Sequence, residues 1–120
     1  MSYVCVIRNS KMNNSQKFDD NLQDLARFAR VISHPARLAI LQYLAKTKTC
    51  ISGDITDFIP LSRTTVSQHL KELRDLGLIH GEIDGLKINY CLCNSVLAKY
   101  KELFTTFFHD IGTAELKCNC

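Results

Sequence analysis

The sequence predicts a mainly α-helical domain with one small β-hairpin, and three observations support this fold class. Apolar residues recur at helical spacing in several segments between residues 19 and 112. Asp84-Gly85 separates two runs of alternating apolar and polar residues, which is a strong hairpin signal. The chain has 120 residues, of which 46% are hydrophobic, so it suits one domain with one modest core.

We expect three regions: a polar arm at residues 1–17, a folded domain at 18–112 and a cysteine-containing tail at 113–120. No stretch approaches the roughly 18 apolar residues that a membrane helix requires. The opening residues also lack the basic start and apolar run of a secretory signal. These features favour a cytoplasmic protein with no membrane partner. The formal net charge of +3 is compatible with a nucleic-acid partner but does not require one.

The first two helices are predicted from their ends and their apolar spacing. Asp19 and Asp20 suit a helix N-terminus, where carboxylates meet free amides and the positive end of the helix dipole. We expect this helix to end at about Val31. Pro35 fits the first turn of a second helix, because its missing N–H would be unpaired there anyway. The apolar spacing carries this second helix to about Lys46.

A short third helix and a longer fourth helix follow. Ser52 can cap the third helix, and Pro60 ends it. Ser62 begins the fourth helix, and Gly77 marks its C-terminal end. The fourth helix has one inward stripe at helical spacing, formed by Val66, Leu70 and Leu73.

The hairpin is predicted from residues 78–83 and 86–92, and a last helix follows from Asn94 to about Ile111. This last helix carries more apolar residues than one contact stripe requires. We therefore expect part of its surface, with the first helix, to form a homodimer interface. The interface is expected to draw on Leu97, Tyr100, Leu103, Phe104, Phe107, Phe108 and Ile111.

The order of these elements is that of a winged helix-turn-helix. In this fold one helix buries a stripe while its polar face enters the major groove of DNA. No acidic residue occurs from Ser62 to Lys71, and Lys87 lies in the predicted wing, where a cation can meet phosphate. His69 can either meet a phosphate or pack at the edge of the buried stripe. The predicted DNA contacts are Ser62, Arg63, Thr64, Thr65, Ser67, Gln68, Lys71 and Lys87.

Two segments closely resemble the ArsR/SmtB family of metal-sensing repressors. They are residues 34–41, HPARLAIL, and residues 61–79, LSRTTVSQHLKELRDLGLI. The resemblance covers roughly residues 20–110. It implies a homodimer that binds double-stranded operator DNA through a winged helix in each half and is released by an inducer.

Six cysteines suggest where such an inducer would bind. Reducing compartments keep thiols free, so paired cysteines indicate metal binding or redox chemistry before structural disulfides. Four of the six form two Cys-x-Cys pairs, Cys91 with Cys93 and Cys118 with Cys120. Cys91 and Cys93 stand two residues apart on the second predicted strand, so their side chains project from the same face.

Two inducer sites common in the family are not expected in this chain. The Cys-x-Cys of the third helix has no match in residues 51–56, and Cys50 lies just before them. The zinc site of the last helix corresponds to Asn94, Val96, Phe107 and Asp110. Of these four residues only Asp110 can ligate a metal.

A dimer offers a third arrangement. The last helix is about 27 Å long at 1.5 Å per residue, so the two cysteine pairs of one chain lie far apart. If the last helices pair across a two-fold axis, as the resemblance implies, they run antiparallel. Cys91 and Cys93 of one copy can then meet Cys118 and Cys120 of the other. Three thiolates suit arsenite or antimonite, and four suit Cd, Pb or Zn.

Several alternatives stay open. Cys5 and Cys50 can form a site with the N-terminal arm, or Cys91 and Cys93 can be merely buried. The cysteines can also act as a redox switch. A winged helix used only for protein contacts is a further reading. An enzyme is not expected, because Cys-x-x-Cys, Ser-His-Asp and phosphate-loop patterns are absent. His80 and His109 are expected to be surface or packing residues.

Overall fold

The computed structural model describes residues 17–47, 55–85 and 87–112. Its elements are α1 (Asp20–Val31), α2 (Pro35–Thr47), a 3₁₀ turn (Ile55–Asp57), α3 (Arg63–Leu76), β1 (Ile79–Asp84), β2 (Lys87–Leu92) and α4 (Asn94–Gly112). The mainly α-helical class with one antiparallel hairpin is therefore confirmed. α1 to α4 also begin and end within about two residues of the predicted positions.

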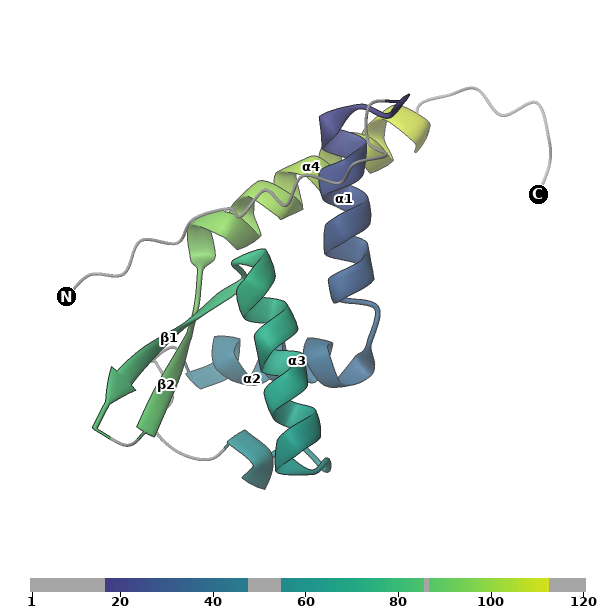
Figure 1. Cartoon of the computed structure of the whole chain (residues 1–120). Helices are drawn as coiled ribbons and strands as arrows, with labels where there is room; N and C mark the ends of the chain where they lie inside the picture. The colour runs from purple at the N-terminus through teal and green to yellow at the C-terminus, as the bar shows by residue number, and fades with distance from the viewer. Residues whose placement is uncertain (1–16, 48–54, 86, 113–120) are drawn as a thin grey trace.

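The core lies where α2, α3, the base of the hairpin and the start of α4 meet. Ile40, Leu73, Leu78 and Tyr100 are each 0% exposed. In Figure 1, α3 occupies the middle of the molecule, with α2 behind it and the hairpin beside it. α2 contacts both α3 and β2, and α1 contacts α3 and α4.

α2 buries one stripe of its surface. Ala36, Ile40 and Leu44 are buried at i, i+4 and i+8, whereas Leu38 is 47% exposed. The short third helix is described only at its end, as the 3₁₀ turn. Phe58, the residue after this turn, is 62% exposed and stacks on Tyr43 with ring centroids 4.5 Å apart. The predicted cap Ser52 lies outside the described residues.

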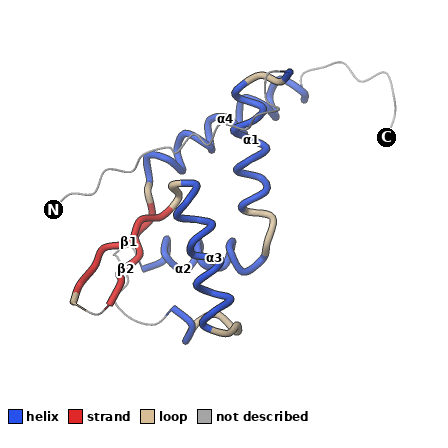
Figure 2. Tube along the Cα trace, viewed as in Figure 1, coloured by secondary structure: helices blue, strands red, loops and turns tan. Residues whose placement is uncertain are grey.

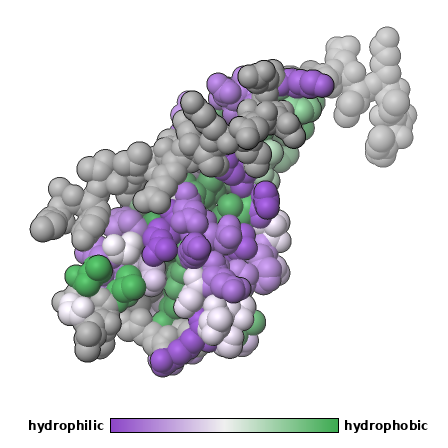
Figure 3. Space-filling view, in the orientation of Figure 1, coloured by the Kyte–Doolittle hydropathy of each residue, from purple (hydrophilic) through white to green (hydrophobic). Residues whose placement is uncertain are grey.

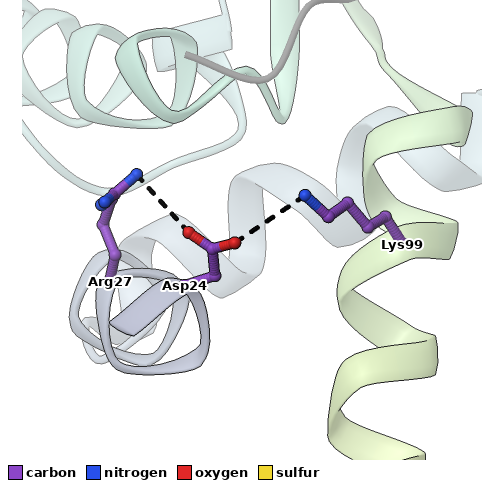
Figure 4. A network of polar contacts seen from close by, with 3 residues as sticks. All are labelled: Asp24, Arg27 and Lys99. Carbon is purple, nitrogen blue, oxygen red and sulfur yellow. Dashed lines mark ion pairs between the residues drawn. The ribbon is translucent and has the colours of Figure 1, made fainter. Parts of the chain in front are cut away.

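α1 and α4 are joined by aromatic and ionic contacts. Phe28 of α1 stacks on Tyr100 of α4 with ring centroids 4.5 Å apart, and it forms a T-shaped pair with Phe104. Asp24 lies 3.8 Å from both Arg27 and Lys99, so one carboxylate links the two helices (Figure 4). These contacts fix the orientation of α4 relative to α1.

The hairpin pairs Ile79 with Leu92 and ends at the pair Asp84–Lys87. Gly85, in the connecting turn, has a φ of 64°, a left-handed conformation that glycine adopts without strain. Figure 2 shows the two strands, in red, beside the helices. The register places His80 directly opposite Cys91. Among the described residues, no helix is both long and apolar enough to cross a membrane.

Candidate nucleic-acid interface and cysteine site

α3 has the two faces that a DNA-reading helix needs. Ser62 caps its N-terminus, and the Ser62 Oγ accepts a hydrogen bond of 3.3 Å from the backbone N–H of Thr65. The predicted stripe is buried, with Val66, Leu70 and Leu73 at 1%, 5% and 0% exposure. This stripe fixes the rotation of the helix, so the opposite face is turned toward solvent.

The predicted contact residues of α3 lie on that solvent face. All of them are exposed except Thr65, which is half-buried, and Thr65 Oγ1 lies 2.9 Å from Ser62 Oγ in the cap. The front of α3 is hydrophilic to neutral in Figure 3. The exposed set comprises Ser62, Arg63, Thr64, Ser67, Gln68 and Lys71. It combines cationic and short polar side chains, which suit phosphates and base edges.

His69 belongs to the packing of the domain. It is 7% exposed, and its Nδ1 accepts a hydrogen bond of 3.1 Å from Nε of Arg37. Arg37 also donates to the carbonyl oxygen of Val31, and the His34 ring lies 4.3 Å from the His69 ring. Burial, followed by the nearby His34 and Arg37, lowers the pKa of His69. Of the two readings of His69, the structure favours the packing one.

The wing tip carries apolar side chains beside the predicted cation. Ile83 and Ile88 form a cross-strand pair, and they are 78% and 44% exposed. Lys87 begins β2, opposite Asp84. The backbone thus places Lys87 at the end of the hairpin, and its side chain lies outside the described residues. Its contact with phosphate remains a prediction.

Cys91 and Cys93 lie at the base of the hairpin, where β2 leads into α4. They are 7% and 2% exposed, and Cys93 belongs to the hydrophobic core. Both sulfurs are in disulfide form in the structure. The backbone N–H of Cys93 donates to the carbonyl oxygen of Leu78. The backbone N–H of Leu97 donates in turn to the carbonyl oxygen of Cys93. The pair therefore sits at a fixed junction between the wing and α4.

A histidine and a carboxylate from β1 join these cysteines. His80 Nδ1 lies 3.2 Å from Cys93 Sγ, and His80 Nε2 lies 3.7 Å from Glu82 Oε1. One donor atom each from His80, Glu82 and Cys91 can be chosen so that all three lie within 4.8 Å of one another. Sulfur, imidazole and carboxylate are ligands that transition metals use, so this donor set fits a metal ion.

His80, expected from the sequence at the surface or in packing, lies in this cluster. Alternation along β1 puts His80 and Glu82 on one face, which was visible in the sequence. Which residues of the second strand share that face depends on the register. The other cysteines, Cys5, Cys50, Cys118 and Cys120, lie outside the described residues. Their predicted roles stay predictions.

α1 and α4 leave apolar side chains uncovered. Phe108 and Ile111 of α4 are 59% and 51% exposed, and Leu22 of α1 is 44% exposed. A groove of about 440 Å³ between the two helices is lined in part by Leu22, Leu25 and Phe107. This is the surface for which the sequence predicted a dimer contact.

Comparison with known proteins agrees with this architecture. Residues 32–82 match a helix-turn-helix domain family. The transcriptional regulator YgaV of Escherichia coli (strain K12) is 30% identical over 97 residues, covering 78% of this chain and 98% of YgaV. The cadmium resistance transcriptional regulatory protein CadC of Listeria innocua is 26% identical over 110 residues, covering 90% of this chain and 92% of CadC.

Solved structures share the fold. An ArsR-like transcriptional regulator from Rhodococcus sp. RHA1 superposes with a TM-score of 0.65 at 21% identity, covering 78% of this chain and 88% of that one. A possible transcriptional regulator for arsenical resistance superposes with a TM-score of 0.56 at 28% identity, covering 76% and 86%. The chain therefore belongs to the ArsR/SmtB family of winged helix-turn-helix transcriptional regulators.

Proposed function

We propose that this protein is a homodimeric repressor that leaves its operator when a thiophilic ion binds the thiolates of Cys91 and Cys93. Each copy presents α3 to one half-site of double-stranded DNA, and the half-sites lie about one helical turn apart. Ser62, Arg63, Thr64, Thr65, Ser67, Gln68 and Lys71 contact the DNA from α3, and Lys87 contacts it from the wing.

The observation that carries the regulatory part is a chain of backbone hydrogen bonds between the cysteines and α3. The N–H of Cys93 donates to the carbonyl oxygen of Leu78 at 2.8 Å. The N–H of Leu78 donates to the carbonyl oxygen of Leu73 at 3.0 Å. Leu73 lies in α3 and is fully buried. A change in the position of Cys93 is therefore passed to the end of the reading helix. A small shift there changes the spacing of the two reading helices in a dimer.

The chemistry of two adjacent thiolates indicates the class of inducer. Soft thiolates select thiophilic ions, and the ligands must be reduced and deprotonated to bind. CadC is named for cadmium resistance, and one structural neighbour is titled a possible regulator for arsenical resistance. With Cys118 and Cys120 of a second copy, three sulfurs suit arsenite or antimonite, and four suit Cd, Pb or Zn.

The test is release of reduced full-length protein from its own promoter fragment, followed by fluorescence anisotropy. Arsenite, antimonite, Cd, Pb and Zn are titrated separately. Cys91→Ser and Cys93→Ser are expected to keep operator affinity and to lose the response, because serine keeps the size but not the thiolate. Cys50→Ser is the matched control. Loss of the response in Cys50→Ser, with both other variants still responsive, would assign the inducer to the N-terminal arm.

A mixing experiment tests the contribution of the tail. One variant lacks Cys91 and Cys93, and the other lacks Cys118 and Cys120. If the site spans two copies, heterodimers of these inactive variants regain one complete site and bind about one ion per dimer. No recovery on mixing would contradict the spanning arrangement.

A second candidate is a redox switch, and the disulfide form of Cys91 and Cys93 favours it. Two thiols and one hydrogen peroxide give one disulfide and two waters, and the disulfide form would release the operator. Peroxide added without any metal separates the two candidates. Release by peroxide alone, with no response of reduced protein to any ion, would replace the metal proposal.

A further inference from the structure

The face of the hairpin that carries Cys91 also carries His80 and Glu82. We propose that His80 Nδ1 is a third ligand beside the sulfurs of Cys91 and Cys93, so that one hairpin alone binds a divalent ion such as Zn²⁺ or Cd²⁺. This inference rests on the proposed metal response and names the ion class and a ligand for it. Glu82 acts as a positioning residue for the His80 ring.

The register of the hairpin brings the three ligands together. His80 and Cys91 are direct cross-strand partners, so their side chains leave the sheet on the same side. His80 Nδ1 lies 3.2 Å from Cys93 Sγ. In a tetrahedral site with metal–sulfur bonds of about 2.3 Å and metal–nitrogen bonds of about 2.0 Å, these two atoms stand about 3.5 Å apart. The observed separation is close to that value.

The other nitrogen of the ring faces a carboxylate. His80 Nε2 lies 3.7 Å from Glu82 Oε1, and the two side chains are 23% and 38% exposed. A ligating histidine commonly donates its second N–H to a carboxylate, which fixes the tautomer and the ring orientation. At 3.7 Å the carboxylate lies on the Nε2 side of the ring without a hydrogen bond to it, and Nδ1 is the nitrogen that faces Cys93.

The donor set selects the ion. Two thiolates and one imidazole suit a borderline ion such as Zn²⁺, and also Cd²⁺. Arsenite and antimonite prefer a third sulfur, which this hairpin lacks among its described residues. A site of two sulfurs and one nitrogen within one copy therefore predicts a divalent metal rather than a metalloid.

The site exists only in the reduced protein, because both cysteines are in disulfide form in the structure. Reduction by a water-soluble phosphine supplies two electrons per disulfide. One disulfide, one phosphine and one water give two thiols and one phosphine oxide. Metal binding then displaces the thiol protons, so affinity rises with pH.

The experiment is a Co²⁺ and Cd²⁺ titration of reduced, metal-free, full-length protein. Co²⁺ reports its ligands through d–d and sulfur charge-transfer absorption, independently of DNA. We compare the native chain with His80→Gln and with His109→Gln, in which an exposed histidine of α4 is changed in the same way. His80→Gln should weaken binding by more than the roughly 10–100-fold that loss of an outer-shell partner costs, and should change the d–d bands, whereas His109→Gln should bind like the native chain.

Glu82→Gln tests the positioning role. It should weaken Co²⁺ binding while leaving the position of the d–d bands in place, because the ligands are unchanged. A shift of the bands in Glu82→Gln would make the carboxylate itself a ligand and overturn this role. If His80→Gln fails to fold, ¹¹³Cd–¹⁵N coupling to the His80 ring in ¹⁵N-histidine-labelled native protein answers the same question.

Failure of this inference is distinguishable from failure of the proposed function. Unchanged Co²⁺ affinity and spectrum in His80→Gln would overturn the inference even if Cd²⁺ still releases the operator. The opposite result is also possible. If the native protein binds Co²⁺ through His80 but none of the ions tested releases it from the operator, the inference stands and the proposed function is wrong.

Discussion

Arg37 Nε in α2 donates a hydrogen bond of 3.1 Å to His69 Nδ1 in α3, across 32 positions of the chain. Because Nδ1 accepts, a neutral His69 carries its proton on Nε2. That atom is buried and has no hydrogen-bond partner among the described residues. The bond ties α3 to α2 directly behind the proposed reading face, and it requires the neutral imidazole.

Lowering the pH should therefore destabilise the domain through His69. Its pKa in the folded protein lies below the ordinary value of 6.5, because of burial, His34 and Arg37, while Glu72 opposes the shift. The unfolded chain then binds the proton first, so the free energy of unfolding falls as the pH drops below about 6.5. The slope for one group is at most about 1.4 kcal/mol per pH unit.

Urea unfolding between pH 5.5 and 8 at one fixed protein concentration measures this dependence. His69→Gln should remove part of the slope, and His109→Gln, at an exposed position, should leave it intact. An equal slope in the native chain and in His69→Gln would show that other groups cause the acid sensitivity.

Gln68→Ala and Thr64→Ala should each weaken operator binding by roughly 1–3 kcal/mol if each loses a base contact. Both side chains are exposed on the face opposite Val66, so the free energy of unfolding should hardly change. Fluorescence anisotropy on the promoter fragment measures the affinity. Gln42→Ala, at an exposed glutamine of α2, is the matched control. Full affinity in both α3 variants would move the reading face elsewhere.

Phe108→Glu and Ile111→Glu should convert the protein to monomers at micromolar concentration. A charge placed on a buried apolar contact costs several kcal/mol, whereas the same charge on a solvated surface costs little. Sedimentation velocity gives the oligomeric state. Ile83→Glu, at the 78% exposed wing tip, should remain dimeric. Dimeric behaviour of both α4 variants would place the interface on another surface.

Gly77→Ala should destabilise the domain by about 1–2 kcal/mol. Gly77 ends α3 with a φ of 89°, a left-handed conformation that costs an L-residue about this much. Its N–H also donates to the carbonyl oxygen of Arg74 in the C-terminal cap. Gly112→Ala is the control, because an added Cβ there meets no other element of the described residues within 4 Å. Equal melting temperatures for native protein and Gly77→Ala would contradict the strain argument.

The sequence by itself determined the order, type and approximate ends of α1 to α4 and of the hairpin. Helix caps such as Ser62, the left-handed stop at Gly77 and the stripe from Val66 to Leu73 all depend on residues a few positions apart. Local spacing and local backbone conformation depend on neighbouring residues, so they can be predicted directly from the sequence. The exposed polar face of α3 followed from them, because a buried stripe leaves only one opposite face for polar residues.

The tertiary structure alone decided which distant side chains meet. His69 could have faced phosphate or the core, and only the packing of α2 against α3 brings Arg37 to its Nδ1. His80 lies beside Cys93 because the strands pair with His80 opposite Cys91, and sequence alternation leaves that register open. Contacts between elements depend on register and helix rotation. These are fixed by the burial of the whole core rather than by any local segment.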